Sequence, residues 1–202
     1  IKILPNRYSD AACYRGLARE LSAICKIPFK EAKLLPPKVR HKNKIQSIIE
    51  VPNLCRRLMT CRIEDISLGT TPAWMKDALE TYGIRSINGI IDITNYVTIE
   101  TGQPLHAFDA NKMEGNELVA RQAHEGEIVE TLDGKKIILN PSALVLSDAR
   151  NALDIAGIKG GTRAEITAKT KNIVLTAGNF DGTLIYKTAK RIGITTDASI
   201  RF

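Results

Sequence analysis

The order of its secondary-structure patterns restricts what this chain can fold into more than any other feature. Amphipathic helical patterns fill much of the region before Pro104, whereas short β-rich stretches dominate after it. A parallel sheet with crossover helices requires strands and helices to alternate regularly, and this sequence lacks that alternation. The pattern therefore predicts an α+β fold, with helices and strands largely segregated along the chain.

Apolar spacing and end signals predict four helices, at residues 9–27, 72–82, 88–102 and 184–192. We expect Ser9 or Asp10 to cap the first helix. The second helix has the clearest ends, because Thr71 is a natural N-cap before Pro72 and Gly83 supplies a C-terminal stop.

Enrichment in Val, Ile, Leu and Thr predicts strands at residues 45–51, 58–66, 117–123, 127–132, 136–139, 143–148, 152–158 and 172–177. Asp133-Gly134 lies between two of these stretches and is typical of a β-hairpin turn. A length of 202 residues suffices for one sizeable domain or two small, closely packed ones.

The net charge of +7 favours a polyanionic partner, although a solvated basic surface explains it equally well. Lys38, Arg40, Lys42 and Lys44 form a basic run that is either a nucleic-acid contact or a solvated loop. No apolar run approaches the ~20 residues that a membrane span needs, and no basic helix has the layout of a DNA-reading element. We therefore expect a cytoplasmic protein with no membrane or DNA partner.

Polar residues that the core and turns do not require occur at three places. Thr94 and Asn95 lie inside a predicted helix, where they either serve a site or have a capping or structural role. His106 either orients a water or an ester carbonyl, or is a hydrogen-bonded structural residue. Gly160 and Gly161 follow a β-rich stretch and allow either close approach of a ligand or a tight turn.

The signatures of several enzyme classes are missing from the sequence. It contains no G-x-S-x-G elbow, no H-E-x-x-H motif, no P-loop and no kinase motifs. Its cysteines, histidines and acidic residues do not have the spacing of a metal site. The residues by themselves thus predict a pocket near His106 and Gly160, but they name no substrate.

Several motifs, taken in chain order, resemble the editing-site domain of bacterial phenylalanyl-tRNA synthetase beta subunits. The motifs are Pro5-Asn6-Arg7, Gly16-Leu17-Ala18-Arg19-Glu20-Leu21, Ile87-Asn88, Thr94-Asn95-Tyr96-Val97, residues 100–109, Thr131-Leu132-Asp133-Gly134, Ile155-Ala156-Gly157, Gly160-Gly161, Thr196-Asp197-Ala198-Ser199 and Arg201-Phe202. The resemblance runs essentially from end to end, and the ordered series is far more specific than any single motif.

This resemblance implies a three-layer β/β/α sandwich of two intertwined modules, which form one compact domain over residues 1–202. It also implies that the chain is a fragment of a longer protein and that its pocket hydrolyses tyrosine wrongly attached to phenylalanine tRNA. A synthetic site sized for phenylalanine must reject a molecule with one extra hydroxyl. A second site can achieve this by hydrogen bonding to that hydroxyl.

Carried over residue by residue, the resemblance assigns catalytic roles to His106, Asn95 and Thr94. It places Gly160 and Ala198 where the aromatic ring of the substrate needs room. Family members usually carry a glutamate that grips the tyrosine hydroxyl, and Thr176 occupies that position here. A carboxylate hydrogen bond is worth roughly 1.5–3 kcal/mol against ~1 for a neutral one, so our hypothesis is that editing is weakened, altered or lost.

The resemblance further implies a whole enzyme that joins phenylalanine to its tRNA with ATP and Mg²⁺ and contains a synthetase alpha subunit. The motifs for that step are missing from this chain, so we expect no aminoacylation, cofactor or metal within it. One alternative is a non-catalytic tRNA-binding or scaffold module of the synthetase. Another is a free-standing hydrolase that acts on released aminoacyl-tRNA.

Overall fold

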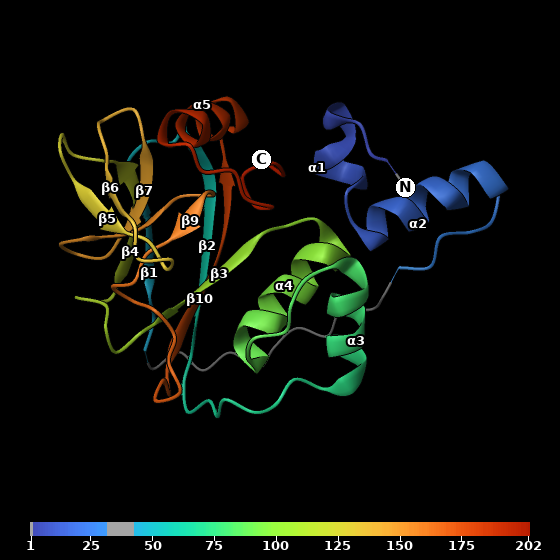
Figure 1. The fold of residues 1–202 in the computed structure, drawn as a ribbon, viewed down its shortest axis with the longest axis horizontal. Coiled ribbons are helices and arrows are strands. Elements are labelled where there is room, and N and C mark those ends of the chain that lie inside the picture. The colour runs from blue at the N-terminus through green and yellow to red at the C-terminus, as the bar shows by residue number, and fades with distance from the viewer. Residues whose placement is uncertain (1, 32–42) are drawn as a thin grey trace.

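The computed structural model describes residues 2–31 and 43–202, and it has the α+β architecture predicted from the sequence. Three layers are visible in Figure 1: a five-stranded sheet, a three-stranded sheet, and helices on the outer side of the smaller sheet. The β/β/α arrangement is therefore confirmed. Lys38, Arg40 and Lys42 of the basic run lie outside the described residues.

The larger sheet has the strand order β1-β4-β7-β8-β9. Its strands are β1 (Gln46–Ile49), β4 (Glu117–Gln122), β7 (Leu144–Ser147), β8 (Ala152–Ile155) and β9 (Lys159–Gly160). β1 is parallel to β4, and the other pairs are antiparallel. β5 (Ile128–Glu130) and β6 (Lys136–Ile138) form the hairpin that Asp133-Gly134 predicts.

The smaller sheet has the order β2-β10-β3 and is antiparallel throughout. Its strands are β2 (Cys55–Ile63), β10 (Ile173–Phe180) and β3 (Leu105–Asp109). β3 corrects the prediction, which placed no strand there, and β2 begins three residues before the predicted 58–66 stretch. β2 and β3 lie between β1 and β4 in the chain, and β10 follows β9, so the strands of the two sheets are interleaved along the sequence.

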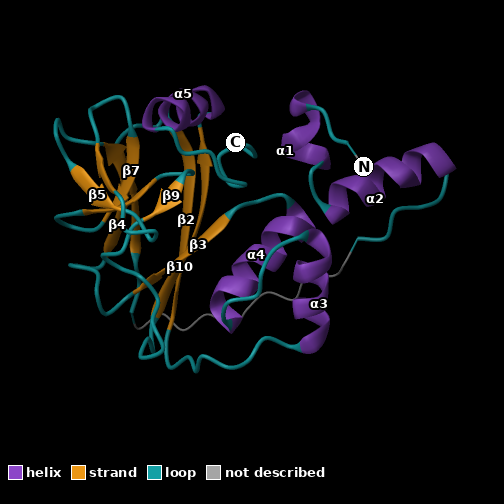
Figure 2. Ribbon diagram, viewed as in Figure 1, coloured by secondary structure: helices purple, strands orange, loops and turns teal. Residues whose placement is uncertain are grey.

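The helices are α1 (Tyr8–Ala11), α2 (Tyr14–Cys25), α3 (Ala73–Tyr82), α4 (Gly89–Thr101) and α5 (Gly182–Ile192), preceded by a 3₁₀ turn at Pro5–Arg7 (Figure 2). The first predicted helix is broken, since Ser9 and Asp10 lie within α1 and the Cys13 thiol caps α2 by accepting from Gly16 N. No helix in residues 2–31 and 43–202 is long and apolar enough to cross a membrane.

The main core lies between the two sheets and is largely aliphatic. Its fully buried side chains include Leu118, Leu144, Leu153, Ile155, Val174 and Phe108. Burying each such side chain stabilises the fold by roughly 1.5–3 kcal/mol. A smaller cluster of Met75, Leu79 and Ile99 joins α3 to α4. Two sheets are thus held face to face, and the residues described next lie where the sheets meet.

Candidate functional site

Strand pairing brings His106 and Thr176 to the same face of the smaller sheet. They are direct partners in the register of β3 and β10. Directly opposed residues of an antiparallel pair point their side chains to one side, with Cβ atoms about 4.5–5.5 Å apart. The two side chains therefore share one surface, and it faces the larger sheet.

A second strand pair supplies the opposite wall. Asp154 on β8 is the register partner of Gly160 on β9. Since Gly160 has no side chain, the space opposite Asp154 stays open on that face of the sheet. The imidazole of His106 enters this space: a Cβ built on Gly160 would lie 2.7 Å from its Cε1 atom.

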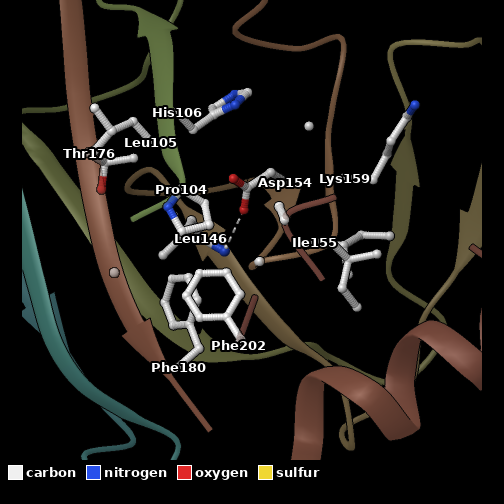
Figure 3. Close-up of a pocket in the computed structure, with 15 residues that line it drawn as sticks. Pro104, Leu105, His106, Leu146, Asp154, Ile155, Lys159, Thr176, Phe180 and Phe202 are labelled. Carbon is white, nitrogen blue, oxygen red and sulfur yellow. Dashed lines mark hydrogen bonds between the residues drawn. The ribbon is translucent and has the colours of Figure 1, made fainter. Parts of the chain in front are cut away.

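A cavity of about 90 Å³ lies between these walls, lined by His106, Thr176, Asp154, Gly160 and Ala198 (Figure 3). The rest of its wall is mainly apolar and includes Pro104, Leu146, Ile155, Ile158, Phe180 and Phe202. A water needs about 10–15 Å³, and a cavity of about 150 Å³ accommodates benzene. This cavity therefore has room for several waters, whereas a tyrosine ring enters only if a lining side chain moves.

His106 is the histidine of this cavity, and its surroundings keep it neutral. Its ring packs against the edge of Phe108, with centroids 4.6 Å apart and an interplanar angle of 66°. Burial lowers the pKa of His106 to about 4, because the imidazolium would lose its hydration there. At neutral pH the imidazole can accept one hydrogen bond and donate another, which suits it to orienting a water.

Ala198 reaches the cavity through a tight turn near the C-terminus. Ser199 Oγ accepts from the backbone N of Thr196 at 2.9 Å, and the Thr196 hydroxyl donates to the carbonyl of Ile158, also at 2.9 Å. The second bond ties this turn to the loop before β9. Phe202 follows, and its ring centroid lies 5.1 Å from that of Phe180. The C-terminal residues thus close one side of the cavity.

The Thr176 hydroxyl and the Asp154 carboxyl are polar groups to which the mainly apolar walls offer few hydrogen-bond partners. Thr176 Oγ1 is buried and has no hydrogen-bond partner among the described residues. Asp154 Oδ1 accepts from the backbone N of Leu146 at 3.2 Å, and burial raises the pKa of this carboxyl to about 7. Sequence reasoning missed Asp154, although an acid within the apolar stretch Ala152–Ile155 was a usable signal.

Thr94 and Asn95, the other two predicted site residues, do not line this cavity. Both lie on α4, and the Thr94 hydroxyl donates to the carbonyl of Ile91 at 2.8 Å. Asp109, at the end of β3, is hydrogen-bonded to other residues than His106: Oδ1 accepts from Asn111 N at 3.0 Å, and Oδ2 accepts from the Thr170 hydroxyl. Four of the six predicted residues therefore meet in one place, and two remain on a neighbouring helix.

Comparison with known proteins confirms the resemblance seen in the motifs. Residues 54–202 match the family described as the B3/4 domain. All of this chain aligns with the phenylalanine–tRNA ligase beta subunits of Protochlamydia amoebophila (43% identity over 205 residues) and Moorella thermoacetica (37% over 206 residues). It covers 25% of each relative, so the chain spans about a quarter of their length.

A solved structure supports the fold. The N-terminal fragment of the phenylalanyl-tRNA synthetase beta subunit from Pyrococcus horikoshii superposes with a TM-score of 0.54 at 16% identity. The match covers 93% of this chain and 59% of that fragment. At so low an identity the similarity establishes the arrangement of sheets and helices alone.

Proposed function

Because this chain belongs to the B3/4 domain family, we propose that it is the proofreading part of a phenylalanine–tRNA ligase beta subunit. Its cavity would hydrolyse the ester that joins tyrosine to phenylalanine tRNA. The observation that carries the proposal is the meeting of His106, Gly160, Thr176 and Ala198 around one cavity, because each comes from a different part of the sequence. Motif matching by itself requires no such meeting.

The reaction needs a positioned water more than it needs a strong base. In ester hydrolysis the water oxygen bonds to the carbonyl carbon and gives up a proton. The bond from that carbon to the ribose oxygen breaks, and the ribose oxygen takes up a proton in turn. Neutral His106 can hold the attacking water by accepting its hydrogen bond. The apolar rings of Phe180 and Phe202 provide a surface for an aromatic side chain.

The remaining assignments belong to the ligase that contains this segment. We propose that its partners are phenylalanine tRNA and an alpha subunit, and that ATP and Mg²⁺ serve aminoacylation elsewhere in a cytoplasmic enzyme. Within this chain the proposal assigns no cofactor or metal to the hydrolysis. The +7 charge of the chain suits contact with a tRNA backbone.

The second candidate is a non-catalytic tRNA-binding module, and the small cavity volume favours it. A space of about 90 Å³ requires a side chain to move before an aromatic ring fits. If Thr176 recognises the phenolic hydroxyl of tyrosine, the discrimination between tyrosine and phenylalanine would rest on a neutral hydrogen bond worth about 1 kcal/mol. The hypothesis of a non-catalytic module predicts tRNA binding without deacylation.

Deacylation by the intact ligase separates the two functions. Phenylalanine tRNA mischarged with tyrosine, called tyrosyl-tRNA below, would be incubated with the ligase in the absence of ATP. The wild type would be compared with His106→Ala and with His124→Ala, a matched change at an exposed histidine. We expect His106→Ala to lower the rate about a hundredfold, since loss of a positioned acid–base group typically costs this much. His124→Ala should retain the wild-type rate.

Two results would contradict the proofreading proposal. A wild-type ligase that leaves tyrosyl-tRNA intact would support the non-catalytic module. Equal rates for wild type and His106→Ala would place the hydrolysis outside this cavity.

A further inference from the structure

Asp154 is a buried acid that forms no ion pair with the residues in 2–31 and 43–202, and its position needs an explanation. It is only 5% exposed, in the second strand from the edge of the larger sheet. Lys159 lines the same cavity, but its Nζ lies 4.0 Å from Asp133 Oδ2 and its side chain runs away from Asp154 in Figure 3. A carboxyl kept in such surroundings is costly, so a ligand that hydrogen-bonds to it would offset the cost.

One oxygen of this carboxyl remains available to a ligand. Oδ1 accepts from Leu146 N, whereas Oδ2 receives no hydrogen bond from the residues that the structure describes. Figure 3 shows the carboxyl in the middle of the cavity, between the His106 imidazole and the rings of Phe180 and Phe202. The unpaired Thr176 hydroxyl lines the same cavity.

The depth of Asp154 in the cavity determines which end of an aminoacyl ligand contacts it. A tRNA is too large to enter a cavity of about 90 Å³, so the ester must stay at the mouth and the side chain must point inward. Although its imidazole is desolvated, the His106 residue as a whole is partly exposed, whereas Asp154 is only 5% exposed. The inner carboxyl therefore meets the ring end of the ligand rather than its α-ammonium group.

We propose that Asp154 determines the specificity of this cavity by accepting a hydrogen bond from the phenolic hydroxyl of a bound tyrosyl group. The inference rests on the proposed proofreading function and adds the residue that recognises the substrate. Tyrosine supplies the donor that Oδ2 lacks, and a charge-assisted bond of this kind is among the stronger ones. Phenylalanine leaves the carboxyl desolvated and unpaired, so it is rejected by the same group.

Binding of two non-hydrolysable ligands to the intact ligase tests the proposal. The probes are the tyrosyl and phenylalanyl amides of 3′-amino-3′-deoxyadenosine, measured by calorimetry with the aminoacylation site filled by a phenylalanyl-adenylate analogue. The variants are Asp154→Asn and, as the matched control, Asp77→Asn at an exposed position on α3. Asparagine keeps an acceptor for Leu146 N and removes a buried carboxyl, so the fold should tolerate it.

We expect Asp154→Asn to weaken the tyrosyl amide about tenfold and to strengthen the phenylalanyl amide about threefold, because the carboxyl that phenylalanine leaves desolvated and unpaired is gone. Asp77→Asn should change neither. Equal weakening of both amides would assign Asp154 to the α-ammonium group and overturn the proposal. If Asp154→Asn binds both amides with wild-type affinity, and the ligase still deacylates tyrosyl-tRNA, the role of Asp154 is overturned but the proofreading function is not. If the wild-type ligase neither binds the amides nor deacylates tyrosyl-tRNA, both the role of Asp154 and the proofreading function are overturned.

Discussion

Gly160 controls the shape of the cavity because it lets the His106 imidazole come so close. A Cβ at this position would lie 2.7 Å from Cε1 of His106 and 3.1 Å from Cδ1 of Leu132. The first distance is shorter than non-bonded carbon atoms tolerate, so the imidazole must swing away. The free space into which the imidazole can move is the cavity itself. A methyl group at position 160 would therefore reduce the volume of the cavity and displace His106.

Gly160→Ala should accordingly lower tyrosyl-tRNA deacylation by the intact ligase at least tenfold, since small displacements of a catalytic group are costly. Gly69→Ala is the control, because none of the described atoms lies within 4 Å of a Cβ there. Steady-state deacylation rates of the two variants provide the measurement. Unchanged activity in Gly160→Ala would show that the His106 position is not critical.

Asp154 makes the discrimination between tyrosine and phenylalanine depend on pH. Burial raises its pKa to about 7, so raising the pH from 6 to 8 ionises it and strengthens its bond to a phenol. His106 has a pKa of about 4 and stays neutral throughout, and the Lys159 ammonium faces Asp133. We expect the ratio of tyrosyl to phenylalanyl amide affinity to rise about fivefold between these pH values.

The same titration of Asp154→Asn should be flat, because the ionising group is gone. Calorimetry at pH 6, 7 and 8 on both proteins gives the comparison. A rise of equal size in the variant would assign the pH dependence to another group and count against Asp154 as the acid that reads the hydroxyl.

Among the elements, the C-terminal ends of α3, α4 and α5 and the start of α4 followed from the sequence because their causes are local. Gly83, Gly102 and Gly193 end their helices in the left-handed region, with φ of 96°, 85° and 69°. Asn88 caps α4 by accepting from the backbone N of Ile90 and Ile91. Each signal acts within a few residues of chain, so it can be read without tertiary structure.

Some features that depend on distant partners were predicted wrongly. β3 has five residues, and it is a strand because β10, some 70 residues later, pairs with it. Thr71 is not the N-cap of α3, since Pro72 holds that position and the Thr71 hydroxyl donates to Asp92 on α4 instead. Asp92 also accepts from Ser86 Oγ and from Ile87 N, so it fixes the start of α4.

The candidate site divides in the same way. The residues alone indicated His106 and Gly160, whereas Thr176 and Ala198 came from a resemblance that encodes tertiary structure, and all four line one cavity. Asp154 is an acid within an apolar stretch, but only the order β7-β8-β9 shows that its strand lies inside the sheet. Burial of that kind depends on strand order, which local patterns do not determine.

At the scale of the whole molecule, Arg201 joins the two ends of the chain. Its side chain is completely buried, and its Nε lies 2.7 Å from Asp197 Oδ2. Nη1 donates to the carbonyl of Ala12, just before α2, and Nη2 donates to the Tyr82 hydroxyl at 3.0 Å. In Figure 1 the C-terminus accordingly lies between α5 and α1. One guanidinium thus ties α2 and α3 to the turn that carries Ala198.

Arg201→Met should therefore release the N-terminal helices and disturb the cavity together. The change leaves the Ala12 carbonyl and the Tyr82 hydroxyl without a donor, and losing such buried hydrogen bonds costs about 2 kcal/mol or more. Hydrogen exchange of the α2 amides in the intact ligase should then be roughly thirtyfold faster, since about 1.4 kcal/mol corresponds to tenfold. Arg163→Met, at an exposed arginine, should leave exchange unchanged. If α2 exchanges at the wild-type rate in Arg201→Met, the N-terminal helices are held by their packing on α4, and the Ala198 turn is independent of them.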